Sequence, residues 1–572
     1  MKVLAMMLSQ NLKKHGEWII LSIIMALSVL PRLIFISLFP SQFVSDFAVI
    51  FRFGLVMSQD IFARGEAWNF INPGTPFFLS LLFRTIPVEP ELVARWATAL
   101  ITGILPLIPF LVWRNVFSLQ ARTISAFLLA TWPGQIIFSG IPAQDNWVLF
   151  PALLLCALCV RNLVLQEGGF PFWGAVLYIL AVFIRQEMFV VLFPAFFVIL
   201  WAKTFQRFLS NLFFASITLL SLLSILILYR GTATGHYTLT TSHFGEAMLG
   251  SYVPGSGKTW ADPKPYLAAN APHLLYQNQG KLSQKDATSL VWQEIQDRPV
   301  FHIIRVISLP VSDIFSLEES LAYWSLTNPE FLTGGYKNPF FINEILPQLK
   351  YFSLFSHFLF GYSIIFVLLK KKNVWPVIFL LLTLLLKVFV HAFIVSQSRF
   401  YLMSIALEFL VIGVVIDNIL SEKKKQLIKL SLFLTCACFI LLVGFTFFAD
   451  KYISTHDVIP QYSYSFPIYI GNTTFDCEMD EGLLFAIYFG QEKARIHVKF
   501  LDVEPYPGEK VEVRCNTSSI PTNISLNIYD YYQTGDLPDR IKQVLYVNDK
   551  KIFVYDIADK TWSGAHRIEL EP

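Results

Sequence analysis

Long apolar runs alternate with two polar stretches along the chain. The apolar runs fill residues 18–229 and 352–449, whereas residues 230–351 and 450–572 have the composition of soluble protein. A helix of about 20 apolar residues is long enough to cross a bilayer. The pattern therefore predicts a polytopic α-helical membrane protein with about eleven transmembrane helices. Residues 18–38 are expected to be a retained first helix, because they are long enough to span and no small-residue cleavage site follows them.

The short apolar stretch 73–86 decides the predicted topology. If it does not span, the lysine clusters at 370–372 and 423–425 lie on the same side as the lysines that precede the first helix. Lysine and arginine collect on the cytoplasmic side of membrane proteins. We therefore expect a cytoplasmic N-terminus in a bacterial inner or plasma membrane, with 73–86 as a juxtamembrane or re-entrant helix on the outer face. Residues 39–91 and 230–351 become outer loops.

The C-terminal segment differs from the membrane part in its pattern. Apolar and polar residues alternate in short runs, as at 494–500 and 524–528, which is typical of β-strands. The prediction is a transmembrane module over residues 1–449 and an extracytoplasmic β-sandwich-like domain over residues 450–572. Cys477 and Cys515 would form a disulfide in that location. This domain either binds an acceptor or caps the membrane part, and both readings stay open.

The composition restricts the partners. Hydrophobic residues make up 55% of the chain and charged residues 15%, against about 25% charged in soluble proteins. The lipid bilayer is therefore a partner. The net charge of +3 gives no reason to expect a nucleic acid. The oligomeric state is left open.

Two acidic residues lie close to apolar helices on the predicted outer side. Asp46 follows the first predicted span, residues 18–38, and Asp145 lies in a short turn between two spans. Charges near hydrocarbon are costly and are functional candidates. Each aspartate has a simpler interpretation as the N-cap of the helix that follows it.

Five basic residues are candidates for binding an anion on the same side. Arg185 lies in a turn with few polar neighbours, Lys387 and His391 share one helical face, and Lys258 lies in the large loop. Arg399 opens a later span. Contact of long basic side chains with lipid headgroups would explain any one of them alone. Residues 254–259 look like half of a phosphate loop, but Tyr252 occupies the place of its first glycine, so no nucleotide site is expected.

Several short motifs occur in a particular order. They are Pro31-Arg32-Leu33, Asp46, Pro73-Gly74-Thr75-Pro76, Ala94-Arg95-Trp96, Trp132-Pro133, Asp145, Arg185-Gln186-Glu187, Asp297-Arg298-Pro299 and Ser398-Arg399-Phe400-Tyr401. This set, over roughly residues 15–420, resembles the GT-C glycosyltransferases, and most of all the branch of protein O-mannosyltransferases and lipid A aminoarabinose transferases. That family usually has Asp-Glu at the first acid, whereas Phe47 follows Asp46 here.

The resemblance implies transfer of a sugar from a polyprenyl-phosphate donor to a glycan, lipid or protein acceptor. Asp46 would be the general base, and Asp145 a second catalytic residue that holds the acceptor, orients Asp46 or shares a cation. Arg185, Lys258, Lys387, His391 and Arg399 would bind the donor phosphate. Arg95, His236 and His243 are further candidates in the outer loops. A single displacement would invert the anomeric centre. No cofactor is implied with certainty, and a divalent metal is left open.

Two alternatives from other classes remain. A lipid-linked polysaccharide ligase or polymerase also has many spans and a large outer loop, and it would rely on an arginine and a histidine in that loop. A lipid or polymer transporter would carry charged residues along a path through the membrane. The clustering of charges at helix ends disfavours the transporter.

Overall fold

A computed structural model gives the structure of the protein. The ranges that it describes are 2–41, 43, 45–62, 71–166, 169–234, 237, 244–253, 266–267, 271, 284–326, 346–370, 374–394, 396–420, 422 and 425–456, together with nine C-terminal strands. Contacts divide the chain into two units. One comprises Met1–Phe244, Ile303–Thr327 and Tyr336–Tyr452, and the other comprises Gly245–His302, Asn328–Gly335 and Ile453–Pro572.

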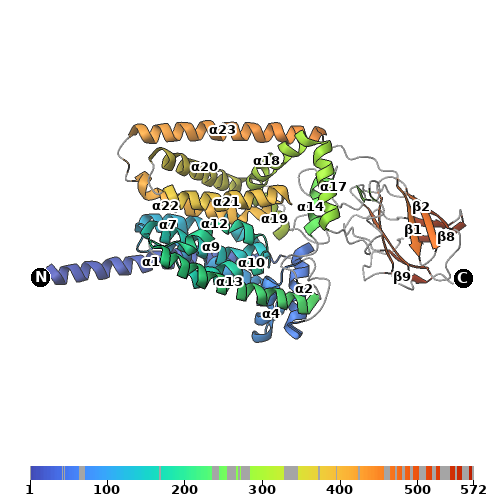
Figure 1. The fold of residues 1–572 in the computed structure, drawn as a ribbon, viewed down its shortest axis with the longest axis horizontal. Helices are drawn as coiled ribbons and strands as arrows, with labels where there is room; N and C mark the ends of the chain where they lie inside the picture. The colour runs from blue at the N-terminus through green and yellow to red at the C-terminus, as the bar shows by residue number, and fades with distance from the viewer. Residues whose placement is uncertain are drawn as a thin grey trace. The chain divides into compact units, whose positions relative to one another are not determined.

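The first unit is helical (Figure 1). In chain order its elements are α1 (Lys2–Leu38), α2 (Ser45–Gln59), α4 (Gly74–Thr85), α5 (Pro90–Gly103), α6 (Leu107–Val112), α7 (Leu119–Thr131), α8 (Pro133–Phe138), α9 (Gln144–Leu165), α10 (Pro171–Ile184), α11 (Met188–Val191), α12 (Phe193–Leu200), α13 (Phe205–Thr234), α18 (Pro299–Phe315, which begins in the second unit), α19 (Leu317–Leu326), α20 (Leu346–Lys370), α21 (Val374–Phe393), the short 3₁₀ helix η3 (Ser398–Tyr401), α22 (Leu402–Leu420) and α23 (Lys425–His456).

Eight helices in the described residues are long and apolar enough to cross a membrane, or nine if the bent pair α18 and α19 is one span. The chain is therefore an integral membrane protein, as predicted. The eight are Gly16–Leu38, Pro90–Val112, Gln144–Leu165, Phe205–Thr232, Tyr351–Lys370, Val374–Phe393, Ser398–Leu420 and Lys425–Ile453. The orientation of the termini stays a prediction.

Three of the eleven predicted spans differ from this set. Residues 122–138 are split into α7 and α8 at Pro133, and residues 187–203 are split into α11 and α12 next to Pro194. Proline lacks an N–H group and its ring clashes with the preceding helical turn. Residues 171–184 form α10, which has only 14 residues. Hydropathy alone did not reveal these breaks.

The break after α7 leaves carbonyl groups that need a donor. The guanidinium of Arg32, which is fully buried, donates hydrogen bonds to the carbonyl oxygens of Ala130 (3.0 Å) and Leu129 (3.3 Å). The last carbonyls of a helix have no partner within the helix. Arg32 therefore stabilises the end of α7 from α1.

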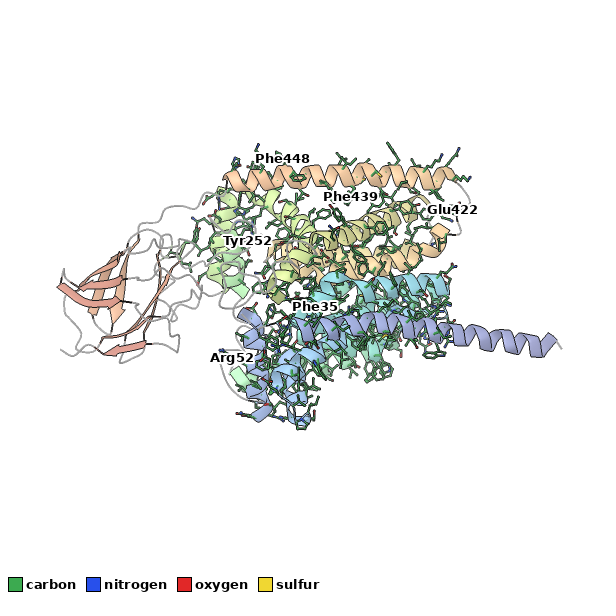
Figure 2. The ribbon with its side chains drawn as sticks, turned by 180° about the vertical axis from the view of Figure 1, so that it is seen from behind. Phe35, Arg52, Tyr252, Glu422, Phe439 and Phe448 are labelled. Atoms are coloured by element: carbon green, nitrogen blue, oxygen red, sulfur yellow. The ribbon has the colours of Figure 1, made fainter. Side chains whose placement is uncertain are left out.

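Helix α22 lies at the centre of the unit, whereas α13 and α23 lie at its periphery. The α22 helix packs against α7, α9, α20 and α21 and is almost wholly buried. On α23, Phe439 contacts Phe315 and Phe358, while Phe448 is exposed (Figure 2). Large exposed apolar side chains on a helix of this length are typical of a lipid-facing surface.

Helices α2 and α4 form a pair that is too short to span. The α4 helix has 12 residues and packs closely on α2, where Gly54 faces Leu79 and Phe83. The Arg84 side chain donates to the carbonyl oxygens of Met57 (2.8 Å) and Ser58 (2.6 Å). At about 1.5 Å per residue, α4 is roughly half as long as the hydrocarbon core is thick. This agrees with the prediction that 73–86 does not cross the membrane.

The second unit contains α14 (Phe244–Tyr252, which begins one residue before the unit) and α17 (Gln284–Asp297). Its strands are β1 (Tyr464–Ile470), β2 (Thr473–Met479), β3 (Leu483–Phe489), β4 (Ala494–Phe500), β5 (Lys510–Thr517), β6 (Ile524–Ile528), β7 (Lys542–Val547), β8 (Lys550–Asp556) and β9 (His566–Glu569). They form two sheets with the orders β1-β2-β5-β7-β8 and β3-β4-β6-β9. The β-sandwich-like domain itself stays a prediction.

The predicted disulfide has no support in the structure. Strands β2 and β5 are antiparallel, and the backbone of Cys477 lies opposite that of Cys515. The side chains of both cysteines lie outside the described residues. Among the described side chains the cysteines Cys156, Cys159, Cys436 and Cys438 are free.

Replacing Gly74 with alanine is expected to destabilise the membrane part. A Cβ atom at Gly74 would lie 2.6 Å from the carbonyl oxygen of Phe183, so backbone at the end of α10 would have to move. Overpacking of this kind costs about 2 kcal/mol. Thermal unfolding in detergent measures the loss. Gly444→Ala is the matched control, because no atom lies within 4 Å of its new Cβ, and equal stability of the two variants would contradict the expected contact.

Candidate functional site

The turn between α21 and α22 carries the first ion pair of the site. η3 holds Arg399 so that its Nη2 donates to Oδ2 of Asp46, at the start of α2, over 2.6 Å. The side chain of Arg399 is 5% exposed and that of Asp46 is 53% exposed. The guanidinium also lies over the rings of Phe47 (4.8 Å) and Trp324 (4.9 Å). The buried Arg399 thus holds the Asp46 carboxylate at a position that solvent can reach.

A second group of charges surrounds Arg185, in the turn between α10 and α11. Its guanidinium pairs with Asp145 in the first turn of α9 and with the neighbouring Glu187. All three side chains are largely buried. Helix α9 has no side-chain N-cap hydrogen bond. The carboxylate of Asp145 therefore binds Arg185, and the capping interpretation does not describe it.

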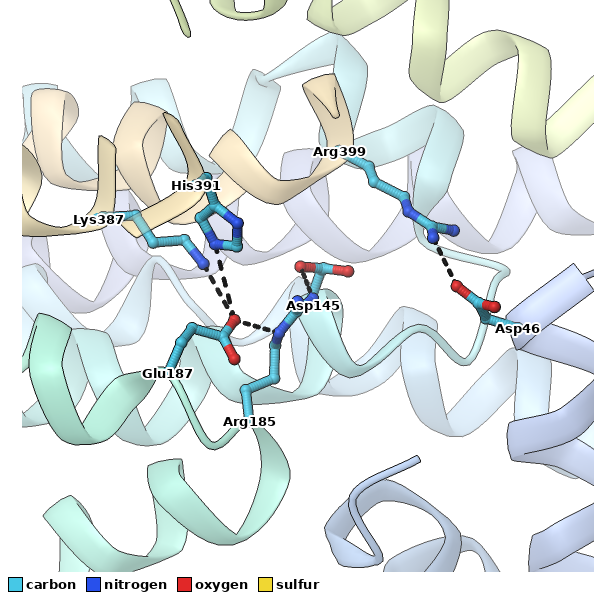
Figure 3. A network of polar contacts seen from close by, with 7 residues as sticks. All are labelled: Asp46, Asp145, Arg185, Glu187, Lys387, His391 and Arg399. Atoms are coloured by element: carbon cyan, nitrogen blue, oxygen red, sulfur yellow. Dashed lines mark hydrogen bonds and ion pairs between the residues drawn. The ribbon is translucent and has the colours of Figure 1, made fainter. Parts of the chain in front are cut away.

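Helix α21 supplies two further basic groups to Glu187. The Lys387 Nζ donates to Oε1 of Glu187 over 3.4 Å, and Nε2 of His391 lies 3.7 Å from the same oxygen. The two residues are one turn apart and lie on one face of α21, as their spacing predicted, and both lie near the same carboxylate. Figure 3 shows these contacts with those of Arg185.

Phe400 joins the two groups of charges. The guanidinium carbons of Arg185 and Arg399 lie 4.8 Å and 5.2 Å from the centre of its ring. The imidazole of His391 stacks on the same ring at 4.8 Å. Cations are attracted to aromatic faces. One aromatic ring thus holds three basic side chains close together without hydrogen bonds to them.

Glu187 is the functional candidate that the sequence analysis missed. It lies in a turn outside the eight apolar helices, and burial acts to raise the pKa of its carboxyl group. The three basic side chains around it outweigh burial and lower that pKa to about 2. Glu187 is therefore ionised at neutral pH and balances the basic groups. The sequence signal that could have identified Glu187 is an acidic residue two positions after Arg185, in a turn between apolar runs.

Among the remaining predicted site residues, Arg95 is described by the structure and lies outside this network. Arg95 donates to the carbonyl oxygen of Ser41 (2.7 Å) and pairs with Glu91, which anchors the chain between α1 and α2. Lys258, His236 and His243 lie outside the described residues. Within the described part of the chain, no group of three His, Cys, Asp or Glu residues is arranged to hold a metal ion.

The comparisons with known proteins give distant similarities of structure. No protein-family model matches the chain, and no curated protein matches it. The chain is similar to the apo form of the Archaeoglobus fulgidus oligosaccharyltransferase, with 13% identity and a TM-score of 0.41. It is also similar to archaeal oligosaccharyltransferase AglB from that organism in complex with an inhibitory peptide and a dolichol-phosphate, with 14% identity and a TM-score of 0.38. Each match covers 77% of this chain and 56% of the other. Similarity of this degree assigns no activity, and the functional proposal rests on the residues.

Replacing Glu187 with glutamine is expected to lower the free energy of unfolding by about 3 kcal/mol, because it leaves buried basic groups without their counter-charge. Glu91→Gln is the control, since its carboxylate is 36% exposed and a surface pair contributes at most about 1 kcal/mol. Denaturant unfolding in detergent measures both.

The difference between wild type and Glu187→Gln should depend on pH. The pKa of the Glu187 carboxyl is lowered in the folded protein from its ordinary 4.5 to about 2. A group with a lowered pKa stabilises the fold above its ordinary pKa and loses that contribution as the pH falls through its folded value. The part of this difference that comes from Glu187 should be fully present above pH 4.5 and shrink towards pH 2. A difference that grows as the pH falls would contradict the assigned ion pairs.

Proposed function

We propose that the chain is a membrane glycosyltransferase that moves a sugar from a polyprenyl-phosphate donor to an acceptor on the extracytoplasmic face. The observation that supports this most is the ion pair between the half-exposed Asp46 and the buried Arg399, next to a cluster of further basic groups. Such a transfer needs a base for the acceptor and fixed positive charge for the departing phosphate. The order of motifs along the chain supports the same class.

In the proposed reaction a hydroxyl oxygen of the acceptor attacks the anomeric carbon of the sugar. Its proton passes to the carboxylate of Asp46, which is the solvent-accessible acid of the network. The bond between the anomeric carbon and the phosphate oxygen breaks, and its electron pair leaves with the lipid phosphate. Attack and departure on opposite faces invert the anomeric centre.

The basic residues are proposed to stabilise the charge on the phosphate. Arg399, Arg185 and Lys387 already face carboxylates, which holds them in place before the donor arrives. Preorganised charges of this kind need no rearrangement during the reaction. Asp145 is proposed to orient Arg185, and His391 and Lys258 remain candidates for contact with the phosphate. The proposal assigns no metal.

Helices α2 and α4 are proposed to border the path of the prenyl chain. Val49 and Val56 of α2 are exposed, so this helix presents apolar surface beside the carboxylate of Asp46. Exposed apolar side chains on a short helix suit contact with lipid. The C-terminal domain is proposed to lie on the extracytoplasmic side, where it binds the acceptor or covers the membrane part.

Replacing Asp46 with asparagine is expected to reduce sugar transfer by about 10²–10⁴-fold, the usual contribution of a general base. The assay uses purified protein in nanodiscs with a panel of radiolabelled polyprenyl-phosphate sugars and hydroxyl acceptors. Asp60→Asn is the control at the other end of α2, where Asp60 accepts a hydrogen bond from the N–H of Phe62 over 2.9 Å. It should transfer as the wild type does.

Each other result points to a different class. Equal transfer by wild type and Asp46→Asn would remove Asp46 from the chemistry and favour the ligase or polymerase. Movement of labelled lipid between the leaflets of proteoliposomes, without any transfer by wild type, would favour the transporter.

Replacing Arg399 with lysine is expected to lower kcat by about 10²-fold, the size of effect seen when one donor to a developing negative charge is lost. Lysine keeps the positive charge but lacks the planar guanidinium, which contacts the rings of Phe47 and Trp324 and the carboxylate of Asp46. The same transfer assay measures the loss. Arg95→Lys, whose arginine contacts Glu91 and a carbonyl outside the network, should keep the wild-type kcat. Similar losses in both variants would indicate a general sensitivity to arginine replacement.

A further inference from the structure

The turn that carries Arg399 is held by a carboxylate that belongs to another segment. Asp313, near the end of α18, is buried and accepts hydrogen bonds on both oxygens. The Ser398 hydroxyl donates to Oδ1 over 3.0 Å, and the Ser396 hydroxyl donates to Oδ2. One serine directly precedes Arg399 and the other lies three residues before it.

A third hydroxyl extends this arrangement beyond Arg399. The Ser396 hydroxyl uses its proton on Asp313, so the Tyr401 hydroxyl is the donor in their 3.0 Å contact. A carboxylate can only accept hydrogen bonds, and bonds to an ionised acceptor are among the strong ones. Asp313 thus binds the turn directly before Arg399, and Ser396 links it to Tyr401 on the other side of Arg399.

The next helix of the same segment contacts Arg399 and the residue that follows Asp46. Trp324 on α19 lies under the guanidinium of Arg399, and its ring meets that of Phe47 edge-on with centres 5.4 Å apart. Phe47 directly follows Asp46. The helices Pro299–Phe315 and Ser320–Leu326 bend by 67°. The segment therefore meets Arg399 twice, through the serines beside it and through the ring of Trp324.

We propose that Asp313 is a positioning residue, which through Ser396 and Ser398 holds the Arg399 guanidinium in place for the reaction. This role rests on the proposed function, because Arg399 is assigned there to the phosphate. The hydrogen bonds of Asp313 go to Ser396 and Ser398 rather than to Asp46 or Arg399, so it acts through the turn. The segment of α18 and α19 is thereby part of the site and does more than connect two spans.

The first test measures the turn and needs no activity. Hydrogen exchange with mass spectrometry on the chain of 572 residues in nanodiscs follows peptides that cover residues 396–401. Asp313→Asn and the double variant Ser396→Ala/Ser398→Ala should each raise exchange there about tenfold, because local opening becomes easier. The double variant removes the two hydrogen bonds but keeps the charge of Asp313, so the effect of the hydrogen bonds can be distinguished from the effect of the charge.

Ser404→Ala is the matched control for the serines. Its hydroxyl is buried near the start of α22 and has no hydrogen-bond partner among the described residues. Exchange in 396–401 should not change in this variant. Unchanged exchange in both Asp313→Asn and the serine double variant would overturn the proposal.

The second test asks whether Asp313 acts through Arg399. Asp313→Asn should lower kcat about tenfold in the wild-type background and leave kcat unchanged in the Arg399→Lys background, since residues that act through one another are not additive. Equal losses in both backgrounds would overturn the positioning role and leave a general effect on stability. If wild type transfers no sugar from any donor, the proposed function fails, and exchange at 396–401 still decides whether Asp313 holds the turn.

Discussion

Charged side chains at the ends of apolar helices need partners of opposite charge, because hydrocarbon cannot solvate them. In this protein Arg185 meets two carboxylates, one on α9 and one in its own turn. The second of these, Glu187, also faces two basic residues of α21. Ion pairing therefore ties together segments that are distant in the chain, and the positions of α9, α10 and α21 depend on it.

The aromatic ring of Phe400 gives this pairing its geometry. Two guanidinium groups and one imidazole contact the ring, so the basic groups lie close together although they repel one another. Each is compensated by a carboxylate nearby, which keeps the cluster stable in the absence of a ligand. Asp46 differs from the other acids because about half of its side chain is exposed. A reactive role for Asp46 and a charge-balancing role for Glu187 are consistent with this difference.

The large loop predicted over residues 230–351 contributes to the helical core more than its composition suggested. Its last part forms α18 and α19, which contact η3, α8 and α20. Asp313 and Trp324 come from this part. In the sequence, Asp313 is one acid in a largely apolar stretch and Trp324 is one aromatic residue among several, and neither has a spacing that indicates a partner. Only the bend between the two helices brings them to the turn at Arg399.

The sequence by itself determined the membrane class, most of the long helices and the candidates Asp46, Asp145, Arg185, Lys387, His391 and Arg399. Apolar length and the cost of charge near lipid are local properties, so they can be read along the chain. The tertiary structure alone decided which acid meets which base, because those partners are up to 353 residues apart. It also decided where the helices break at proline, and it revealed Glu187 and Asp313. Pairing between distant segments depends on how helices pack, and the one-dimensional pattern of residue types does not contain that information.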